Sequence, residues 1–206
     1  MEKLLYIDSC IRDEVSRTKK IATPIINKLK ERYDVETLVI NDLNLTIVKK
    51  DLVNKRTNGI IDEEVLSWAN KVSKADRIVI AAPFWDMSIP AALKSFIELC
   101  SIINVTFASD DKTCFGICNC KKLLYITTRG MNIKTNSELD QATPYLKAKI
   151  DKENRIVISP YASLMAMDTF PKDVYDNIAK LKALDLYSDY GFYEAYDHDN
   201  KGVVKS

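Results

Sequence analysis

Glycine is scarce in this sequence, and its absence near the N-terminus excludes two common kinds of phosphate-binding loop. The 206 residues include only five glycines, and none of them precedes Gly59. The glycine-rich loops that hold nucleotide phosphates need several glycines directly after an early strand. A phosphate site in this part of the chain would therefore have to use other atoms.

The sequence also lacks an excess of either charge and any long hydrophobic run. Thirty basic residues against 29 acidic ones give a net charge of +1, whereas proteins that bind nucleic acid or membrane surfaces usually carry a basic face. No apolar run approaches the roughly 20 residues of a membrane span, and the run before Asp8 is too short for a signal peptide. We therefore expect a cytoplasmic protein that binds neither nucleic acid nor membrane.

Residues that bind metals are few and are not spaced as in common metal sites. The only histidine, His198, lies in a polar stretch near the C-terminus. Cys114, Cys118 and Cys120 are close together, but their spacing is not a usual zinc pattern and no second cysteine pair follows. Five cysteines fit reduced thiols better than a disulfide framework. We expect no metal site, and the sequence leaves open whether these thiols have a function.

Apolar runs alternate with helical patterns along the chain. Four of the five runs have almost continuous apolar centres, which is typical of strands covered on both faces. The alternation predicts one α/β domain over residues 1–206, with a five-stranded parallel sheet and helices on both faces. The expected strands span 3–8, 35–40, 77–83, 122–128 and 155–160, and the expected helices span 17–33, 62–75, 90–103, 138–150 and 173–186.

Two long connections interrupt this alternation. Residues 41–61 form the first connection, for which we predict no regular element. Residues 104–120 form the second, where a turn-prone stretch between apolar segments predicts a small hairpin excursion. Long connections in a compact domain often have a function.

The first helix has two possible starts. Ser16 is a good N-cap residue, and an apolar stripe follows it. Pro24 lies inside this stripe, where proline costs about 3 kcal/mol and bends a helix. The alternative is a helix that begins at Pro24 with Thr23 as its cap. We expect a kinked helix that begins at Arg17.

Three segments should meet where the strands of a parallel sheet end, which is where such sheets bind ligands. The first is the loop Ser9–Thr18, which offers three hydroxyl groups, two arginines and the positive end of a helix. These groups could hold one phosphate monoester, although the loop taken alone favours a plain capped helix with exposed polar residues. The other two segments are 82–98 and 127–132.

The second segment carries bulky groups at the end of a strand. Phe84, Trp85 and Met87 lie where a core residue is not required, and they suit a flat conjugated ligand. The alternative is that they pack under a neighbouring loop. We expect Ser88 to cap the next helix, with Pro90 in its first turn.

The order and spacing of five motifs resembles the FMN-dependent NADH-azoreductases, within the flavodoxin-like NAD(P)H:quinone oxidoreductases. The motifs are IDSC…SRT, AAPFWDMSIPAALKSFIE, NVTF, KKLLYITTRG and TPYL, and the resemblance extends to about residue 186. It implies a flavodoxin-like fold, FMN as cofactor and NADH or NADPH as electron donor. It further implies a quinone or azo compound as acceptor, and a homodimer with its sites at the interface.

The resemblance also implies which residues bind the cofactor. It assigns no catalytic residue, because the flavin carries the hydride chemistry. The sequence leaves the choice between NADH and NADPH open, although the lack of an obvious arginine pair for a 2′-phosphate favours NADH. The implied cofactor-binding residues are Ser9, Ser16, Arg17, Thr18, Pro83, Phe84, Trp85, Asp86, Met87, Thr128, Arg129, Gly130 and Met131.

Three features depart from the family pattern. Asp86 replaces an asparagine beside the flavin, Met131 replaces a glycine, and an aromatic-rich tail follows at 187–206. The tail either packs on its own domain or crosses a dimer interface to reach the partner's pocket. These departures leave the substrate range and the redox tuning of the flavin open. The alternative function is a flavin-binding electron carrier or redox-sensing module that turns over no small substrate.

Overall fold

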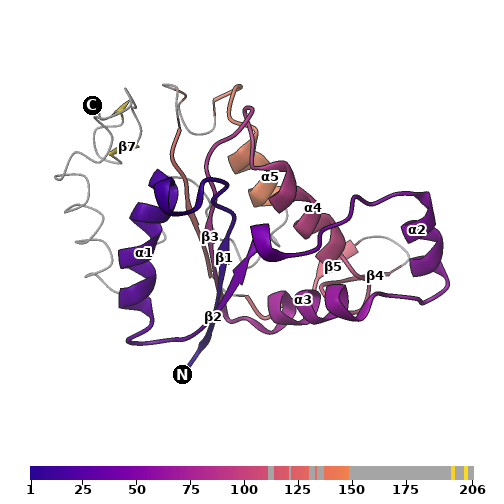
Figure 1. The fold of residues 1–206 in the computed structure, drawn as a ribbon. Coiled ribbons are helices and arrows are strands. Elements are labelled where there is room, and N and C mark those ends of the chain that lie inside the picture. The colour runs from indigo at the N-terminus through magenta and orange to yellow at the C-terminus, as the bar shows by residue number, and fades with distance from the viewer. Residues whose placement is uncertain are drawn as a thin grey trace.

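Four parallel strands form the central sheet of the structure, a computed structural model (Figure 1). It describes residues 1–110, 114–120, 122–129, 133, 137–148, 196–197 and 202–203. The strands are β1 (Lys3–Asp8), β2 (Asp34–Val39), β3 (Arg77–Ala81) and β6 (Lys122–Ile126), in the order β2-β1-β3-β6. They match the first four expected strands, and the fifth, 155–160, lies outside the described residues.

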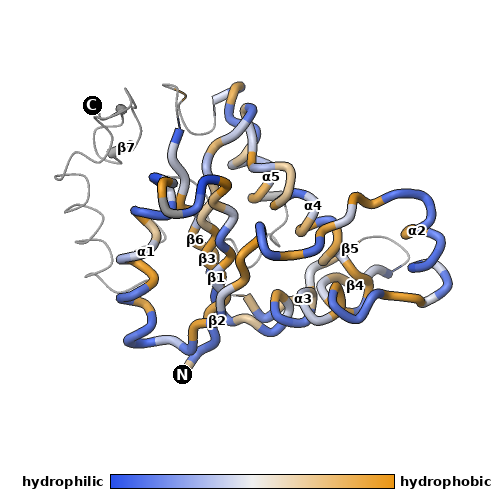
Figure 2. Tube along the Cα trace, in the orientation of Figure 1, coloured by the Kyte–Doolittle hydropathy of each residue, from blue (hydrophilic) through white to orange (hydrophobic). Residues whose placement is uncertain are grey.

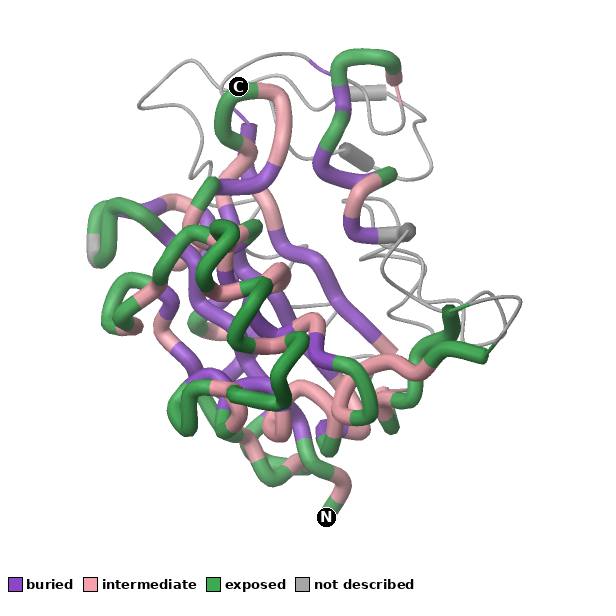
Figure 3. The backbone as a smooth tube through the Cα atoms, turned by 90° about the vertical axis from the view of Figure 1, so that its right-hand side faces the viewer, coloured by how far each residue is buried: buried purple, intermediate pink, exposed green. Residues whose placement is uncertain are grey.

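Helices cover both faces of the sheet, because successive strand residues point to opposite sides. Leu4 and Tyr6 of β1 pack with α1 (Arg17–Leu29), whereas Leu5 and Ile7 pack with helices on the other face. Those helices are α3 (Glu63–Lys74), α4 (Ala91–Cys100) and α5 (Ala142–Ala148). Strands β1, β3 and β6 are accordingly buried in all but their first residue, whereas β2, at the edge of the sheet, is mostly exposed or half-buried (Figure 3).

Helix α1 begins at Arg17, as predicted. The Ser16 side chain caps it by accepting from the backbone N–H of Lys19, and Pro24 lies inside the helix. The alternative start at Pro24 is wrong, because the Thr23 hydroxyl donates to the Lys19 carbonyl oxygen in a turn that is already helical (2.8 Å). Six buried side chains of α1 offset the cost of the internal proline.

The first long connection contains a helix that the sequence did not indicate. Helix α2 (Lys50–Thr57) buries none of its residues and is mostly hydrophilic (Figure 2). Arg56 attaches it to the end of α4 by donating to the carbonyl oxygens of Leu99 (2.6 Å) and Ser101 (3.2 Å). The sequence of α2 has no apolar stripe that would predict a helix. The contact that anchors it is instead with residues far along the chain.

The second connection forms the predicted hairpin, of β4 (Phe107–Ser109) and β5 (Cys114–Gly116), paired antiparallel. Within the tail, Tyr196–Asp197 (β7) and Gly202–Val203 (β8) also pair antiparallel. In the part of the chain that the structure describes, no helix has both the length and the apolar character needed to cross a membrane.

Candidate functional site

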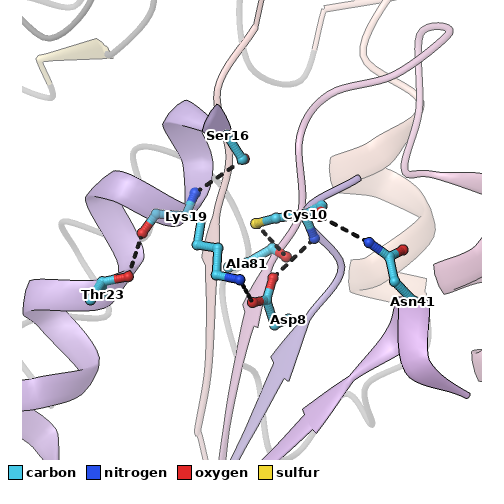
Figure 4. Close-up of polar contacts among 7 residues, drawn as sticks. All are labelled: Asp8, Cys10, Ser16, Lys19, Thr23, Asn41 and Ala81. Atoms are coloured by element: carbon cyan, nitrogen blue, oxygen red, sulfur yellow. Dashed lines mark hydrogen bonds and ion pairs between the residues drawn. The ribbon is translucent and has the colours of Figure 1, made fainter. Parts of the chain in front are cut away.

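Side chains rather than glycines hold the loop that follows β1 (Figure 4). The Asp8 carboxylate accepts from the backbone N–H of Cys10 (3.0 Å) and pairs with the Lys19 ammonium (3.4 Å). On the other side, the Asn41 amide donates to the carbonyl oxygen of Cys10 (3.1 Å). The loop conformation is therefore fixed by polar contacts of its neighbouring side chains.

This loop presents buried hydroxyl groups at the start of a 13-residue helix. Ser9, Ser16 and Thr18 are all buried at this point. The Thr18 and Thr128 hydroxyl oxygens lie 2.7 Å apart, so one of them donates to the other. That arrangement leaves the second hydroxyl proton of the pair for a ligand. The positive end of the α1 dipole lies at the same place.

Cys10 is a structural thiol rather than a nucleophile. Its sulfur lies 3.7 Å from the Ala81 carbonyl oxygen, between β1 and β3. Burial, together with the neighbouring Asp8 carboxylate, raises the pKa of the Cys10 thiol far above its ordinary value. The thiol is therefore neutral at physiological pH, and a thiolate is the form that reacts.

A tight turn follows β3, and its backbone conformation is unusual. Trp85 and Ser88 exchange two backbone hydrogen bonds (2.8 and 2.9 Å), and Asp86 and Met87 between them have φ of 48° and 62°. Two positive φ values are the pattern of a type I′ turn, which favours glycine at its second central residue. Non-glycine residues in this region cost about 1–3 kcal/mol each, and such strain is common at functional sites.

The turn also displays an aromatic ring and two free donors. The Trp85 side chain is 55% exposed. Among the described residues, neither the Asp86 nor the Met87 backbone N–H has an acceptor. The predicted capping role of Ser88 is wrong: Pro90 is the N-cap residue of α4, without a side-chain hydrogen bond, and Ser88 closes the turn instead.

Arg129, the arginine after β6, points into the protein. Its guanidinium donates to Asp140 Oδ2 (3.1 Å) and to the Ile133 carbonyl oxygen (2.8 Å), and it lies over the Phe84 ring at 4.7 Å from the ring centroid. Asp140, which the sequence reading missed, also accepts from the Thr143 N–H and so caps α5 (3.1 Å). An aspartate three residues before that N–H was the available signal.

The three predicted segments do meet at the carboxyl ends of the strands. Ser9 donates from its backbone to the carbonyl oxygen of Ala81 (2.8 Å), and Phe84 donates in the same way to that of Thr128 (2.9 Å). The hydroxyl contact between Thr18 and Thr128 joins the first segment to the third. Pro83 and Arg17 are half-buried in these segments, whereas Gly130 and Met131 lie outside the described residues.

A cavity of about 350 Å³ lies elsewhere, at the amino end of the sheet. Lysine and acidic side chains line it, and one pair, Lys71 and Glu36, forms an ion pair across 2.6 Å. Its open position and paired charges fit a solvated surface hollow. Within the described ranges, no group of three or more candidate metal ligands occurs.

The chain matches the family model described as "Flavodoxin-like fold" over residues 2–152. It is 33% identical over 138 residues to "FMN-dependent NADH:quinone oxidoreductase 2" of Clostridium acetobutylicum, a match that covers 63% of this chain and 68% of that one. It is 32% identical over 156 residues to "FMN-dependent NADH:quinone oxidoreductase" of Clostridium perfringens, covering 71% and 78%.

Among solved structures, the fold is similar to that of an "FMN-dependent NADH-azoreductase" from Bacillus anthracis in complex with FMN. The TM-score is 0.64, with 22% sequence identity, and the match covers 88% of this chain and 99% of that one. At this identity the likeness is one of fold.

Proposed function

Because this chain belongs to the flavodoxin-like fold family of FMN-dependent NADH:quinone oxidoreductases, we propose that it is an FMN-dependent NAD(P)H oxidoreductase that reduces quinones or azo compounds. One observation carries the assignment of cofactor to site. Buried hydroxyls of Ser16, Thr18 and Thr128 gather at the N-terminus of α1, in a loop without glycine. This donor set fits one phosphate monoester, which FMN has.

The phosphate end of the site would be formed by the first loop. Ser9, Ser16 and Thr18 supply hydroxyl groups, Arg17 supplies positive charge, and the helix start supplies backbone N–H groups. The buried carboxylate of Asp8, which directly precedes this loop, is already paired with Lys19. A diphosphate lies along the backbone and normally needs glycine for close approach, so this loop favours FMN over FAD.

The ring end of the site would be formed by the turn after β3. Trp85 offers an exposed aromatic surface, and the backbone N–H groups of Asp86 and Met87 would offer donors to a ring carbonyl or nitrogen. Phe84, Pro83 and the backbone after β6, from Thr128 to Met131, would complete the wall. Bound FMN supplies a conjugated ring that accepts and returns hydride.

The protein's own part is to bind, orient and exclude water. Three groups near the site are not available to move a proton: Asp8 is engaged with Lys19, Arg129 is engaged with Asp140, and Cys10 is a neutral thiol. Positioning of the two substrates against the same ring is therefore the main contribution of this chain. The donor that we propose is NADH.

We also place a homodimer interface beside α4. The large apolar residues Leu93, Phe96 and Leu99 of α4 are buried in the core. The outer face of this helix is therefore not broadly apolar. Beyond its end, however, Ile103 and the hairpin residues Phe115 and Ile117 are exposed. Exposed apolar side chains that gather on neighbouring segments often mark an interface.

Rapid mixing with NADH tests the proposed function most directly. Protein reconstituted with FMN is mixed with NADH without oxygen, and the visible flavin absorbance is followed. We expect rapid bleaching, and then recovery when a quinone is added. A flavin that NADH does not bleach would point to the electron carrier or sensing module. Release of FAD rather than FMN on denaturation, detected by mass spectrometry, would contradict the assignment of the phosphate site.

A further inference from the structure

The ion pair between Arg129 and Asp140 is buried at the candidate site, with side chains that are 2% and 0% exposed. Buried ion pairs contribute little to stability, because desolvation offsets their attraction, and apolar residues of similar size often do as well. Here the pair is also incomplete. In the part of the chain that the structure describes, the buried Nε of Arg129 has no hydrogen-bond partner. Stability alone is a poor reason for this arrangement.

The pair closes a ring of contacts around the turn after β3. At one end of the turn, Phe84 donates to the Thr128 carbonyl oxygen, next to Arg129 (2.9 Å). At the other end, Met87 accepts from the N–H of Gln141, next to Asp140 (2.9 Å). The guanidinium also lies over the Phe84 ring. The two segments that bind the ends of the turn, 128–129 and 140–141, are thus the segments that the ion pair joins.

The turn inside this ring needs outside help to keep its shape. Asp86 and Met87 both have left-handed backbone conformations, although neither is glycine. A strained conformation persists only where the surrounding contacts determine it. The backbone hydrogen bonds at both ends of the turn can determine its conformation only while Thr128 and Gln141 keep their positions.

We propose that Arg129 and Asp140 are positioning residues, whose buried ion pair holds the Trp85–Ser88 turn in its left-handed conformation. The pair thereby fixes the direction of the Asp86 and Met87 N–H groups and of the Trp85 ring. This inference rests on the proposed function for the identity of the ligand, but the conformation of the turn can be measured without any ligand.

Fluorine NMR of the full chain labelled with 5-fluorotryptophan reads the turn directly. The sequence has two tryptophans: Trp85 reports on the turn, and Trp68, buried in α3, reports on the fold. In the double variant Arg129→Gln/Asp140→Asn, we expect the Trp85 line to shift or broaden and the Trp68 line to stay. The FMN dissociation constant should rise at least tenfold. An unchanged Trp85 line with FMN affinity within twofold of wild type overturns the proposal.

A glycine in the turn separates positioning from general support. In a Met87→Gly background, the left-handed conformation no longer needs to be imposed. Breaking the ion pair in that background should therefore change FMN affinity less than threefold. If the loss is as large with glycine as with methionine, the pair does not act through the turn, and the proposal fails.

The opposite end of the sheet offers a matched control. Arg77 likewise pairs with a carboxylate, that of Glu2 (2.7 Å), and lies over an aromatic ring, that of Tyr33 (5.1 Å). The variant Arg77→Gln/Glu2→Gln should leave the Trp85 line and FMN affinity unchanged. If it reproduces the losses, they come from lost stability, which overturns the proposal.

Two further outcomes are distinguishable. If the Trp68 line is lost, the double variant does not fold, and the single variant Arg129→Lys is used in its place. Lysine keeps the positive charge but not the flat contact with the Phe84 ring. We then expect a partial Trp85 shift that Met87→Gly abolishes, and no shift contradicts the proposal. A wild-type protein that binds no FMN defeats the proposed function, while the Trp85 line still decides whether the pair holds the turn.

Discussion

Removing the hydroxyls of Ser16 and Thr18 together should weaken FMN binding strongly. Hydrogen bonds to a charged group contribute about 1.5–3 kcal/mol each, so two lost bonds amount to about 3–6 kcal/mol. The dissociation constant of the variant Ser16→Ala/Thr18→Val should rise by about 10²- to 10⁴-fold. Calorimetric titration of the apo-protein with FMN measures this directly.

The same change also reduces stability, and the two effects must be separated. Ser16 loses its capping bond to the Lys19 N–H (3.3 Å), which costs about 1 kcal/mol. Thr18 loses its 2.7 Å contact and leaves the buried Thr128 hydroxyl unpaired, which costs about 1–3 kcal/mol. Urea denaturation of the apo-protein should show this loss. Thr23→Val in the same helix removes an exposed hydroxyl bond and should leave FMN affinity unchanged.

Riboflavin provides the decisive comparison, because it has the ring but no phosphate. If the hydroxyls hold the phosphate, the double variant and the wild type should bind riboflavin with equal affinity. An equal loss for riboflavin and FMN would show that the change disturbs the whole site. Wild-type affinity for FMN in the double variant would refute the assignment of the phosphate to this loop.

Three further predictions concern charge, a helix end and the thiols. Asp86→Asn should raise the midpoint potential of bound FMN by about 10–30 mV, because it removes a negative charge from the turn that we propose lies beside the ring, while asparagine tolerates the same backbone conformation. Solvent screening of the exposed carboxylate limits the shift, and an unchanged potential would show that the carboxylate does not act on the ring. Arg56→Met should lower the free energy of unfolding by about 1–3 kcal/mol, since carbonyl oxygens at the end of α4 lose their donor; a urea midpoint equal to that of wild type would contradict this. Burial raises the pKa of the Cys100 and Cys120 thiols to about 12, so stability is fully present below the ordinary thiol pKa of about 9 and is lost as the pH rises from there to about 12. Mass spectrometry should find exposed Cys114 alkylated well before buried Cys100 and half-buried Cys120 at pH 8, and equal rates would refute the burial argument.

The sheet could be predicted because its signal is local. The runs that form β1, β3 and β6 are almost continuously apolar, since helices cover both of their faces. Likewise, Ser16 predicts the start of α1, because an N-cap contact joins residues that are close together in the sequence. By contrast, α2 escaped prediction. Its anchor is a contact between Arg56 and carbonyl oxygens more than forty positions away, which no local pattern records.

Parts of the site escaped prediction for the same reason. The resemblance assigned Arg129 to the cofactor, but its charge is engaged by Asp140, which no motif contained. The turn at Asp86 and Met87 lacks the asparagine-glycine signature that identifies such turns. Its conformation is imposed from outside, by Thr128 and Gln141, so the residues of the turn do not encode it themselves.

The scarcity of glycine therefore has one consequence at both ends of the candidate site. Where related architectures let glycine adopt the required backbone, this chain imposes it with polar side chains: Asp8 and Asn41 at the first loop, and the buried pair Arg129 and Asp140 around the turn. A glycine conformation is intrinsic and survives changes nearby, whereas an imposed one fails when its support is removed. Cofactor affinity in this protein should accordingly depend on residues that do not touch the cofactor as strongly as on those that do.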